Sequence, residues 1–140
     1  MKLEINQDNL NQELSEQSSN FVYAATRAAI AEEAHYEAKK ELDEITASVG
    51  LEIRNKAAEE KEKVTEKLLS DRVLLDQRVS KAIDHVNETR KHMATAKGMR
   101  DAWNMRKDLL LRIAHNASAE MYAFGKDTVK TSMDAMAKSA

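Results

Sequence analysis

The residues best placed to do chemistry are a glutamate and a histidine three positions apart, Glu32 and His35. Helical diiron proteins use this Glu-x-x-His spacing to put two ligands on one helix face, but they need a second such pair and further glutamates on facing helices. The sequence holds no second Glu-x-x-His. Glu88 and His92, one helical turn apart, have no further ligands and suit a solvated surface pair. We therefore expect no metal site.

No other residue type predicts a catalytic centre. The four histidines lack serine or aspartate partners at an interpretable spacing, and the three glycines lie too far apart to form a phosphate-binding loop. The chain has no cysteine, which excludes disulfides and thiolate chemistry and agrees with a reducing compartment. We expect a protein that is not an enzyme, binds no cofactor and resides in the cytoplasm, that of the host cell if it is phage-encoded.

A basic segment between positions 90 and 115 is more informative, because seven basic residues stand there against two acidic ones. Its members, here called the basic island, are Arg90, Lys91, Lys97, Arg100, Arg106, Lys107 and Arg112. Trp103 lies between Arg100 and Lys107 on the same helical seam. One interpretation is that the cations contact phosphates while the indole stacks on a base of single-stranded nucleic acid. The alternative is that the long side chains lie along the seam and Trp103 anchors a helix pair.

The composition predicts that helices position these residues. Hydrophobic residues make up 42% of the chain but aromatic residues only 4%, and there is no proline. Such a sequence, rich in alanine, glutamate, lysine and leucine, is typical of long helices or coiled coils. We expect a single all-α domain in five segments: an N-terminal arm over 1–17, a long helix over 20–57, a charged turn region over 58–69, a second long helix over 70–124 and a short C-terminal helix over 126–140.

The boundaries rest on local signals. Asn6 can cap a short helix in the arm, Ser18 to Asn20 can cap the first long helix, and Ser70-Asp71 can begin the second. Alanines crowd one face of the first long helix, which predicts a close helical neighbour. In the second, apolar residues recur at spacings of four and three from Leu75 to Met121, and Gly125 can end it.

These elements predict a long antiparallel hairpin of coiled-coil type with short terminal helices. Residues 1–66 hold 15 acidic and 8 basic groups, whereas residues 67–140 hold 9 and 14. A two-helix layer leaves its outer faces partly uncovered, so we expect a homo-oligomer. No stretch reaches the roughly 20 apolar residues that span a bilayer, so we expect no membrane association.

Four stretches carry a resemblance to a known family. They are Ser18-Ser19-Asn20-Phe21-Val22-Tyr23-Ala24-Ala25, Lys39-Lys40-Glu41-Leu42-Asp43-Glu44-Ile45, Lys67-Leu68-Leu69-Ser70-Asp71 and Ser118-Ala119-Glu120-Met121. In order and pattern the chain resembles the phage recombination mediators of the UvsY type, small helical proteins that help to load a RecA-like recombinase onto single-stranded DNA.

The resemblance implies a DNA-binding cluster late in the first long helix, onto which Arg54 and Lys56 can be carried over. Glu52 stands where the family has a lysine, and Ala57-Ala58 replaces an aromatic pair. We hypothesise that the basic island supplies what this cluster lacks. The resemblance also implies a ring-like homo-oligomer formed through the C-terminal end, where the apolar candidates are Met121, Phe124, Val129, Met133 and Met136.

The sequence thus leads to two hypotheses. The first is a recombination mediator, active in DNA recombination and DNA repair, that binds single-stranded DNA as a homo-oligomer and promotes loading of a RecA-like recombinase. The second is a non-enzymatic coiled-coil scaffold or adaptor protein of a bacteriophage, in which the acidic and basic halves pair with each other or with neighbours. The two differ in whether the basic residues share an open surface or are occupied by acidic partners.

Overall fold

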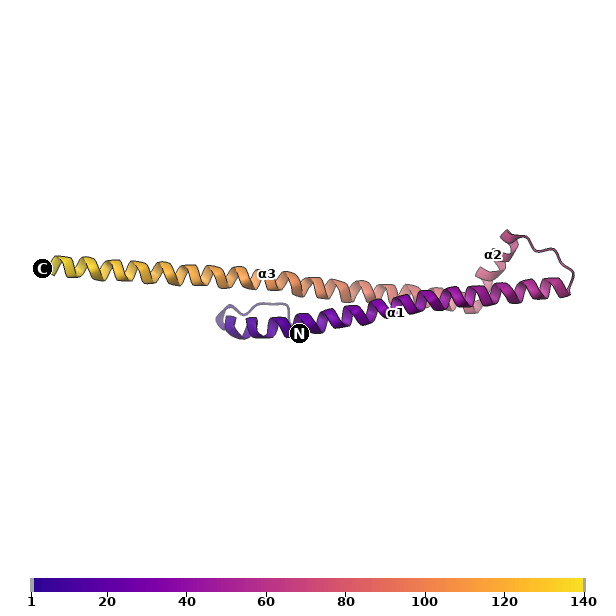
Figure 1. Cartoon of the computed structure of the whole chain (residues 1–140), viewed down its shortest axis with the longest axis horizontal. Helices are drawn as coiled ribbons and strands as arrows, with labels where there is room; N and C mark the ends of the chain where they lie inside the picture. The colour runs from indigo at the N-terminus through magenta and orange to yellow at the C-terminus, as the bar shows by residue number, and fades with distance from the viewer. Residues whose placement is uncertain (1, 140) are drawn as a thin grey trace. The chain divides into compact units, whose positions relative to one another are not determined.

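The computed structural model describes residues 2–139, with side chains for residues 2–125 and 133–138 (Figure 1). A short 3-10 helix, Gln7–Asn9, precedes three α-helices: α1 (Leu10–Glu59), α2 (Glu66–Leu75) and α3 (Gln77–Ser139). No strand occurs among these residues, so the all-α prediction is confirmed. None of the described helices combines the length and the apolar character needed to cross a membrane.

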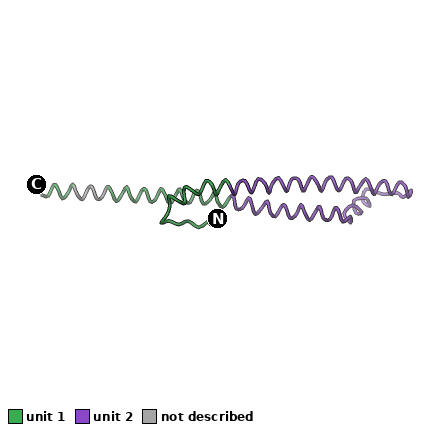
Figure 2. Tube along the Cα trace, turned by 90° about the horizontal axis from the view of Figure 1, so that it is seen from below, with its two compact units in different colours: residues 1–22, 101–140 green, residues 23–100 purple. Residues whose placement is uncertain are grey.

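The chain divides into two compact units, whereas the sequence analysis predicted a single domain (Figure 2). Unit 1 consists of residues 1–22 and 101–140, and unit 2 of residues 23–100. The boundaries between the units fall inside α1, which is 50 residues long, and inside α3, which is 63 residues long. Each unit therefore contains part of both helices.

Unit 2 is built on an antiparallel pair of helices. Lys97 of α3 contacts Glu32 of α1, and Arg78, near the start of α3, contacts Glu52, so residue numbers fall along α3 as they rise along α1. Ala24, Ala28 and Ala38 of α1 are each only 2% exposed, as expected for small side chains that let a second helix approach closely. The predicted close neighbour of the alanine-rich face is α3.

The larger apolar side chains of unit 2 gather where α2 joins the helix pair. Val49 of α1, Leu69 and Val73 of α2, and Val79 of α3 are buried in one cluster. Partly buried residues pack around it: Leu42, Ile45, Ile53, Val64 and Ile83. Short α2 therefore closes one end of the hairpin by supplying the apolar surface that two helices alone cannot provide.

The predicted start of the first long helix is wrong. The sequence analysis placed a cap at Ser18 to Asn20, but α1 begins at Leu10 and passes through these residues. Serine and asparagine act as caps only where the preceding residues leave the helix, and Leu10 to Gln17 are mostly good helix formers. The arm is correspondingly short, and Asn6 caps it as expected, with its Oδ1 accepting a hydrogen bond from the Asp8 amide at 3.0 Å.

The predicted boundaries of the second long helix are also wrong. Ser70-Asp71 lies inside α2, whose N-cap is Thr65, and the chain breaks at Asp76 instead. Asp76 serves both neighbours: its amide donates to the Val73 carbonyl, and its Oδ1 accepts from the Arg78 amide at 2.8 Å. Leu75, which the apolar repeat placed on the seam, ends α2 and is 83% exposed.

The C-terminal part of the chain is not a separate helix. The predicted stop at Gly125 and the predicted short helix over 126–140 are both replaced by α3, which continues to Ser139. One glycine inside a helix costs only about 1 kcal/mol relative to alanine, and no proline follows it to prevent continuation.

Helix α1 ends in a Schellman arrangement built on a lysine. The Glu62 amide donates to the Ala57 carbonyl at 2.8 Å and the Lys61 amide to the Ala58 carbonyl at 3.2 Å. This pattern needs a residue with positive φ, and Lys61 adopts a φ of 54°. The position usually belongs to glycine, because a Cβ there costs roughly 1–2 kcal/mol.

We expect Lys61→Gly to stabilise the protein by about 1 kcal/mol, because glycine adopts this conformation without strain. Urea denaturation followed by circular dichroism measures the gain. Lys61→Ala is the matched control, since it removes the charge but keeps the Cβ, and it should bring no such gain. Equal stability of the glycine and alanine variants would contradict the prediction.

Candidate functional site

The most elaborate polar site in unit 1 surrounds Arg106 of α3, which is only 6% exposed. Its guanidinium makes four hydrogen bonds. Nε donates to the Leu3 carbonyl at 2.9 Å, Nη2 to the Glu4 carbonyl at 3.1 Å, Nη1 to Oε1 of Gln17 at 2.8 Å, and Nη2 also bonds and ion-pairs with the Glu13 carboxylate. One arginine thus ties α3 to the first turns of α1 and to the backbone of the N-terminal arm.

The acidic partner at this site is Glu13, in the first turn of α1. Its carboxylate also accepts a hydrogen bond from the Asn6 amide at 3.3 Å. The hydrogen bond from Arg106, followed by that from the Asn6 amide, holds the pKa of Glu13 below its ordinary value of 4.5. Glu13 therefore stays ionised at neutral pH and joins the arm, α1 and α3.

Trp103 is part of the same site and not of an open surface. The ring is 1% exposed, and the Arg106 guanidinium lies over it at 4.9 Å from the ring centroid. Gln17 Nε2 donates to the Trp103 carbonyl at 2.7 Å. A base cannot stack on a buried ring, so the stacking role predicted for Trp103 conflicts with its position here. The alternative, in which Trp103 anchors the helix pair, agrees with it.

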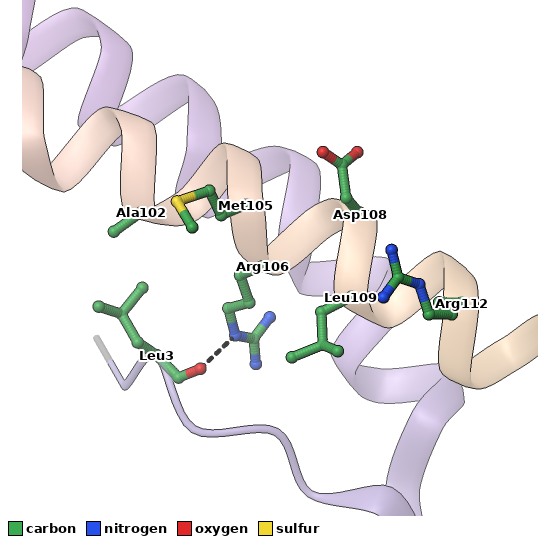
Figure 3. A pocket seen from close by; sticks show the side chains of 7 residues that line it. All are labelled: Leu3, Ala102, Met105, Arg106, Asp108, Leu109 and Arg112. Atoms are coloured by element: carbon green, nitrogen blue, oxygen red, sulfur yellow. Dashed lines mark hydrogen bonds between the residues drawn. The ribbon is translucent and has the colours of Figure 1, made fainter.

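An open groove of about 460 Å³ adjoins Arg106 on the surface of unit 1 (Figure 3). It is lined by Leu3 of the arm and by one side of α3, namely Ala102, Met105, Arg106, Asp108, Leu109 and Arg112. Figure 3 shows the Arg106 guanidinium between Leu3 and Leu109, with its hydrogen bond to the Leu3 carbonyl. Met105 is 71% exposed, Leu109 49% and Leu3 40%, so the groove is apolar and accessible.

The rest of the basic island is divided between the units. In unit 2, Lys97 Nζ lies 2.9 Å from Oε1 of Glu32, Arg100 is half-buried, and Arg90 and Lys91 are exposed. In unit 1, Lys107 is exposed, 3.9 Å from the carboxylate of adjacent Asp108, and Arg112 is exposed at the groove. Arg106 and Lys97 therefore have acidic partners, whereas Arg90, Lys91 and Arg112 make no ion pair with any described residue.

The cluster suggested by the resemblance lies at the α1–α2 end of unit 2. Arg54 is exposed and pairs with Glu66 at 3.3 Å, and Lys56 is exposed beside a groove that Glu62 and Arg72 also line. Glu52, where the resemblance predicts a lysine, binds Arg78 through both oxygens at 3.0 and 2.6 Å. Arg78 thereby lowers the pKa of Glu52. Glu52 thus bridges α1 and α3.

The Glu-x-x-His pair also makes bonds within unit 2. Glu32 is the partner of Lys97, and Nδ1 of His35 lies 3.3 Å from Oγ1 of Thr89. His35 is 8% exposed. Within the described part of the chain, no cluster of three or more histidine, aspartate or glutamate side chains could hold a metal ion.

The residues predicted for oligomerisation lie in the C-terminal part of α3, in unit 1. Met121 and Phe124 are each 76% exposed, Met133 65% and Met136 72%. The side chain of Val129 falls outside the described residues.

Comparisons of the chain with protein-family models, with curated protein sequences and with solved structures each find no match. The resemblance to the UvsY-type mediators therefore remains a prediction that rests on the four quoted stretches.

The sequence analysis missed the partners of Arg106, although a signal for one of them exists. Gln17 lies on a four-three repeat with Leu10, Leu14, Phe21 and Ala24, so it is a polar residue on an apolar seam. A buried amide on one seam and a cation on the other predict a hydrogen-bonded pair. The carbonyls of the arm have no such signal, because any residue type provides them.

We expect Arg106→Met to destabilise unit 1 by on the order of 2–3 kcal/mol, because the buried Gln17 amide and the part-buried carbonyls of Leu3 and Glu4 lose their donor. Hydrogen exchange measured by mass spectrometry should show faster exchange over residues 2–9. Arg90→Met, sixteen positions earlier on the same helix, removes an exposed arginine and is the control. Unchanged exchange in the arm of the Arg106 variant would contradict the anchoring role.

Proposed function

We propose that the protein is a non-enzymatic assembly protein, a coiled-coil scaffold or adaptor that associates with further copies of itself. The observation that carries this proposal is the exposure of the C-terminal stretch of α3. Every described side chain from Ser118 to Gly125 and from Met133 to Lys138 is exposed. The stretch nevertheless contains four large apolar residues with exposures of 65% or more in addition to Tyr122, at 74%: Met121, Phe124, Met133 and Met136.

Such a stretch is costly for a lone chain. A helix without tertiary packing is marginal in water, and exposed apolar patches usually mark an interaction site. Within unit 1, Figure 1 shows α3 continuing toward its C-terminal end, drawn in orange to yellow, past the N-terminal arm and the first turns of α1. A partner that covers the apolar side chains would stabilise both the helix and the assembly.

A second copy is the occupant that the sequence favours. Met121 and Phe124 continue the seam on which Trp103 and Leu110 are buried, through Ala114 and Ala117, at spacings of three and four. Residues 118–138 hold three acidic and three basic groups, so like charge does not oppose pairing of two copies. A second copy supplies a seam of the same composition and the same period.

The ion pairs support an assembly role over a nucleic-acid role. Basic side chains of α3 bind acidic side chains of α1 at Lys97–Glu32, at Arg78–Glu52 and at Arg106–Glu13. At these three positions acidic side chains of the first half pair with basic side chains of the second half, which agrees with the scaffold hypothesis.

The first test replaces Met121 and Phe124 together by aspartate. We expect the protein to associate with a micromolar or lower dissociation constant, and this variant to sediment as a monomer at the same concentrations, because buried carboxylates would oppose pairing. Ala119→Asp with Ala123→Asp adds the same charge on the opposite helix face and should leave association intact. A monomeric unmodified protein would refute the proposed function.

A second candidate, single-stranded DNA binding by a recombination mediator, is favoured by Arg90 and Lys91. These adjacent cations of α3 are exposed and unpaired among the described residues. Electrostatic contacts to phosphates need accessible cations of this kind.

If this second candidate is right, Arg90→Ala with Lys91→Ala weakens binding to a labelled single-stranded oligonucleotide in fluorescence anisotropy. Losing two phosphate contacts lowers the slope of log affinity against log salt by about 1.4. Lys39→Ala with Lys40→Ala removes an equal charge from α1 as the control. Absence of binding at low salt would exclude this function.

A further inference from the structure

We propose that the groove of unit 1 beside Leu3, Met105 and Leu109 is a two-fold contact between two copies of this chain, fixed by Asp108 of each copy binding Arg112 of the other. The inference rests on the proposed function, because it assumes that the protein associates with itself. It adds an interface that is separate from the exposed C-terminal stretch of α3.

The groove lies on one side of α3, next to the side that is buried in unit 1. Trp103, Arg106 and Leu110 are buried. Met105, Leu109 and Arg112 follow one another at spacings of four and three, so they form a neighbouring stripe on the same helix, and they are exposed. Unit 1 therefore has one side of α3 packed internally and an adjacent apolar side that remains open.

A hydrogen bond from Arg106 holds the groove in shape. The hydrogen bond from Arg106 Nε to the Leu3 carbonyl, at 2.9 Å, fixes the arm beside α3. Leu3 thereby forms one wall of the groove, and Met105 and Leu109 form the other (Figure 3). Because a buried arginine sets the position of this wall, the groove can meet a partner without reorganising, which lowers the cost of binding.

Two residues of opposite charge, Asp108 and Arg112, lie at the edge of the groove. Asp108 and Arg112 lie four residues apart, about 6 Å along the helix axis. In the structure they do not pair with each other: Asp108 lies 3.9 Å from Lys107, and Arg112 has no ion-pair partner among the described residues. The pair of Asp108 with Lys107 is exposed and therefore weak, so the carboxylate and the Arg112 guanidinium, one turn apart, can both bind a partner.

The order of Asp108 and Arg112 along α3 suits a contact with two-fold symmetry. In a two-fold contact, if residue i meets residue j of the partner, residue j also meets residue i. Two antiparallel copies of α3 that cross near Leu110 bring Asp108 opposite Arg112 at both ends of the crossing. The two salt bridges then form with no like charges opposed, while the apolar side chains of each groove face the other copy. This self-complementarity is the reason for assigning the groove to a second copy.

The test uses charge reversal in the whole chain, with dissociation constants measured by sedimentation over a dilution series. Asp108→Arg alone and Arg112→Asp alone each place like charges opposite one another, so each should raise the dissociation constant at least about tenfold. An equimolar mixture of the two variants restores both salt bridges between unlike chains and should recover the original constant. The doubly reversed variant should recover it as well.

The mixture separates the proposal from its main rival. If Asp108 and Arg112 only support each other along their own helix, the doubly reversed variant recovers but the mixture does not, and the proposal is overturned. Unchanged association in both single variants also overturns it, while association that still depends on Met121 and Phe124 would leave the proposed function intact. Circular dichroism confirms that each variant is folded.

A second measurement uses the absence of native cysteine. Asp108→Cys and Arg112→Cys chains, mixed under mild oxidation, should form a disulfide between unlike chains faster than either variant does alone, because only the mixed pair faces directly across the axis. Equal rates in the mixture and in the separate variants would count against the two-fold contact.

Discussion

The structure depends on the limited apolar surface that two paired helices can bury. Each helix of a pair covers one stripe of the other, and here the α1 stripe in unit 2 is largely alanine, with Ala24, Ala28 and Ala38 almost fully buried. Alanine lets the helices approach closely but removes little apolar area from water, at roughly 25 cal/mol per Å². The pair therefore needs additional contacts, and each unit provides them differently: unit 2 adds α2 and its valine and leucine cluster, and unit 1 adds the N-terminal arm.

Ion pairs and hydrogen bonds of charged side chains provide many of these additional contacts. Exposed ion pairs contribute little individually, so Arg78 with Glu52 sets register and orientation more than it adds stability. Arg106 is different, because it is buried and every one of its hydrogen bonds replaces one to water. A buried arginine that has several partners is a costly group to leave unsatisfied, which makes the site specific for one arrangement of arm, α1 and α3.

The sequence predicted the helical class, the close neighbour of the alanine-rich face and the cap at Asn6, because these follow from composition and periodicity. It did not predict the break at Asp76 or the continuation through Ser18 to Asn20. Serine, asparagine and aspartate can lie inside a helix as well as cap one, and the packing of the helices determines where each helix begins and ends. Asp76 interrupts the helix where α2 must turn to bring Leu69 and Val73 onto Val49. The basic island was visible as a charge pattern, but its division into paired and unpaired cations depends on which acidic residues lie opposite, and that is a property of the register between helices.

Trp103 shows how one residue can suit two interpretations until its surroundings are known. An indole among cations fits nucleic-acid stacking, yet the cation that contacts this ring is the chain's own Arg106. The indole Nε1 is buried without a hydrogen-bond partner among the described residues, which is an unfavourable state for a donor. The tryptophan is therefore used for its flat face, on which the guanidinium lies while it binds the carbonyls of Leu3 and Glu4. A smaller aliphatic residue could also pack between the helices, but the Arg106 guanidinium would then lose the ring over which it lies. Trp103, Arg106 and the N-terminal arm therefore form one structural unit.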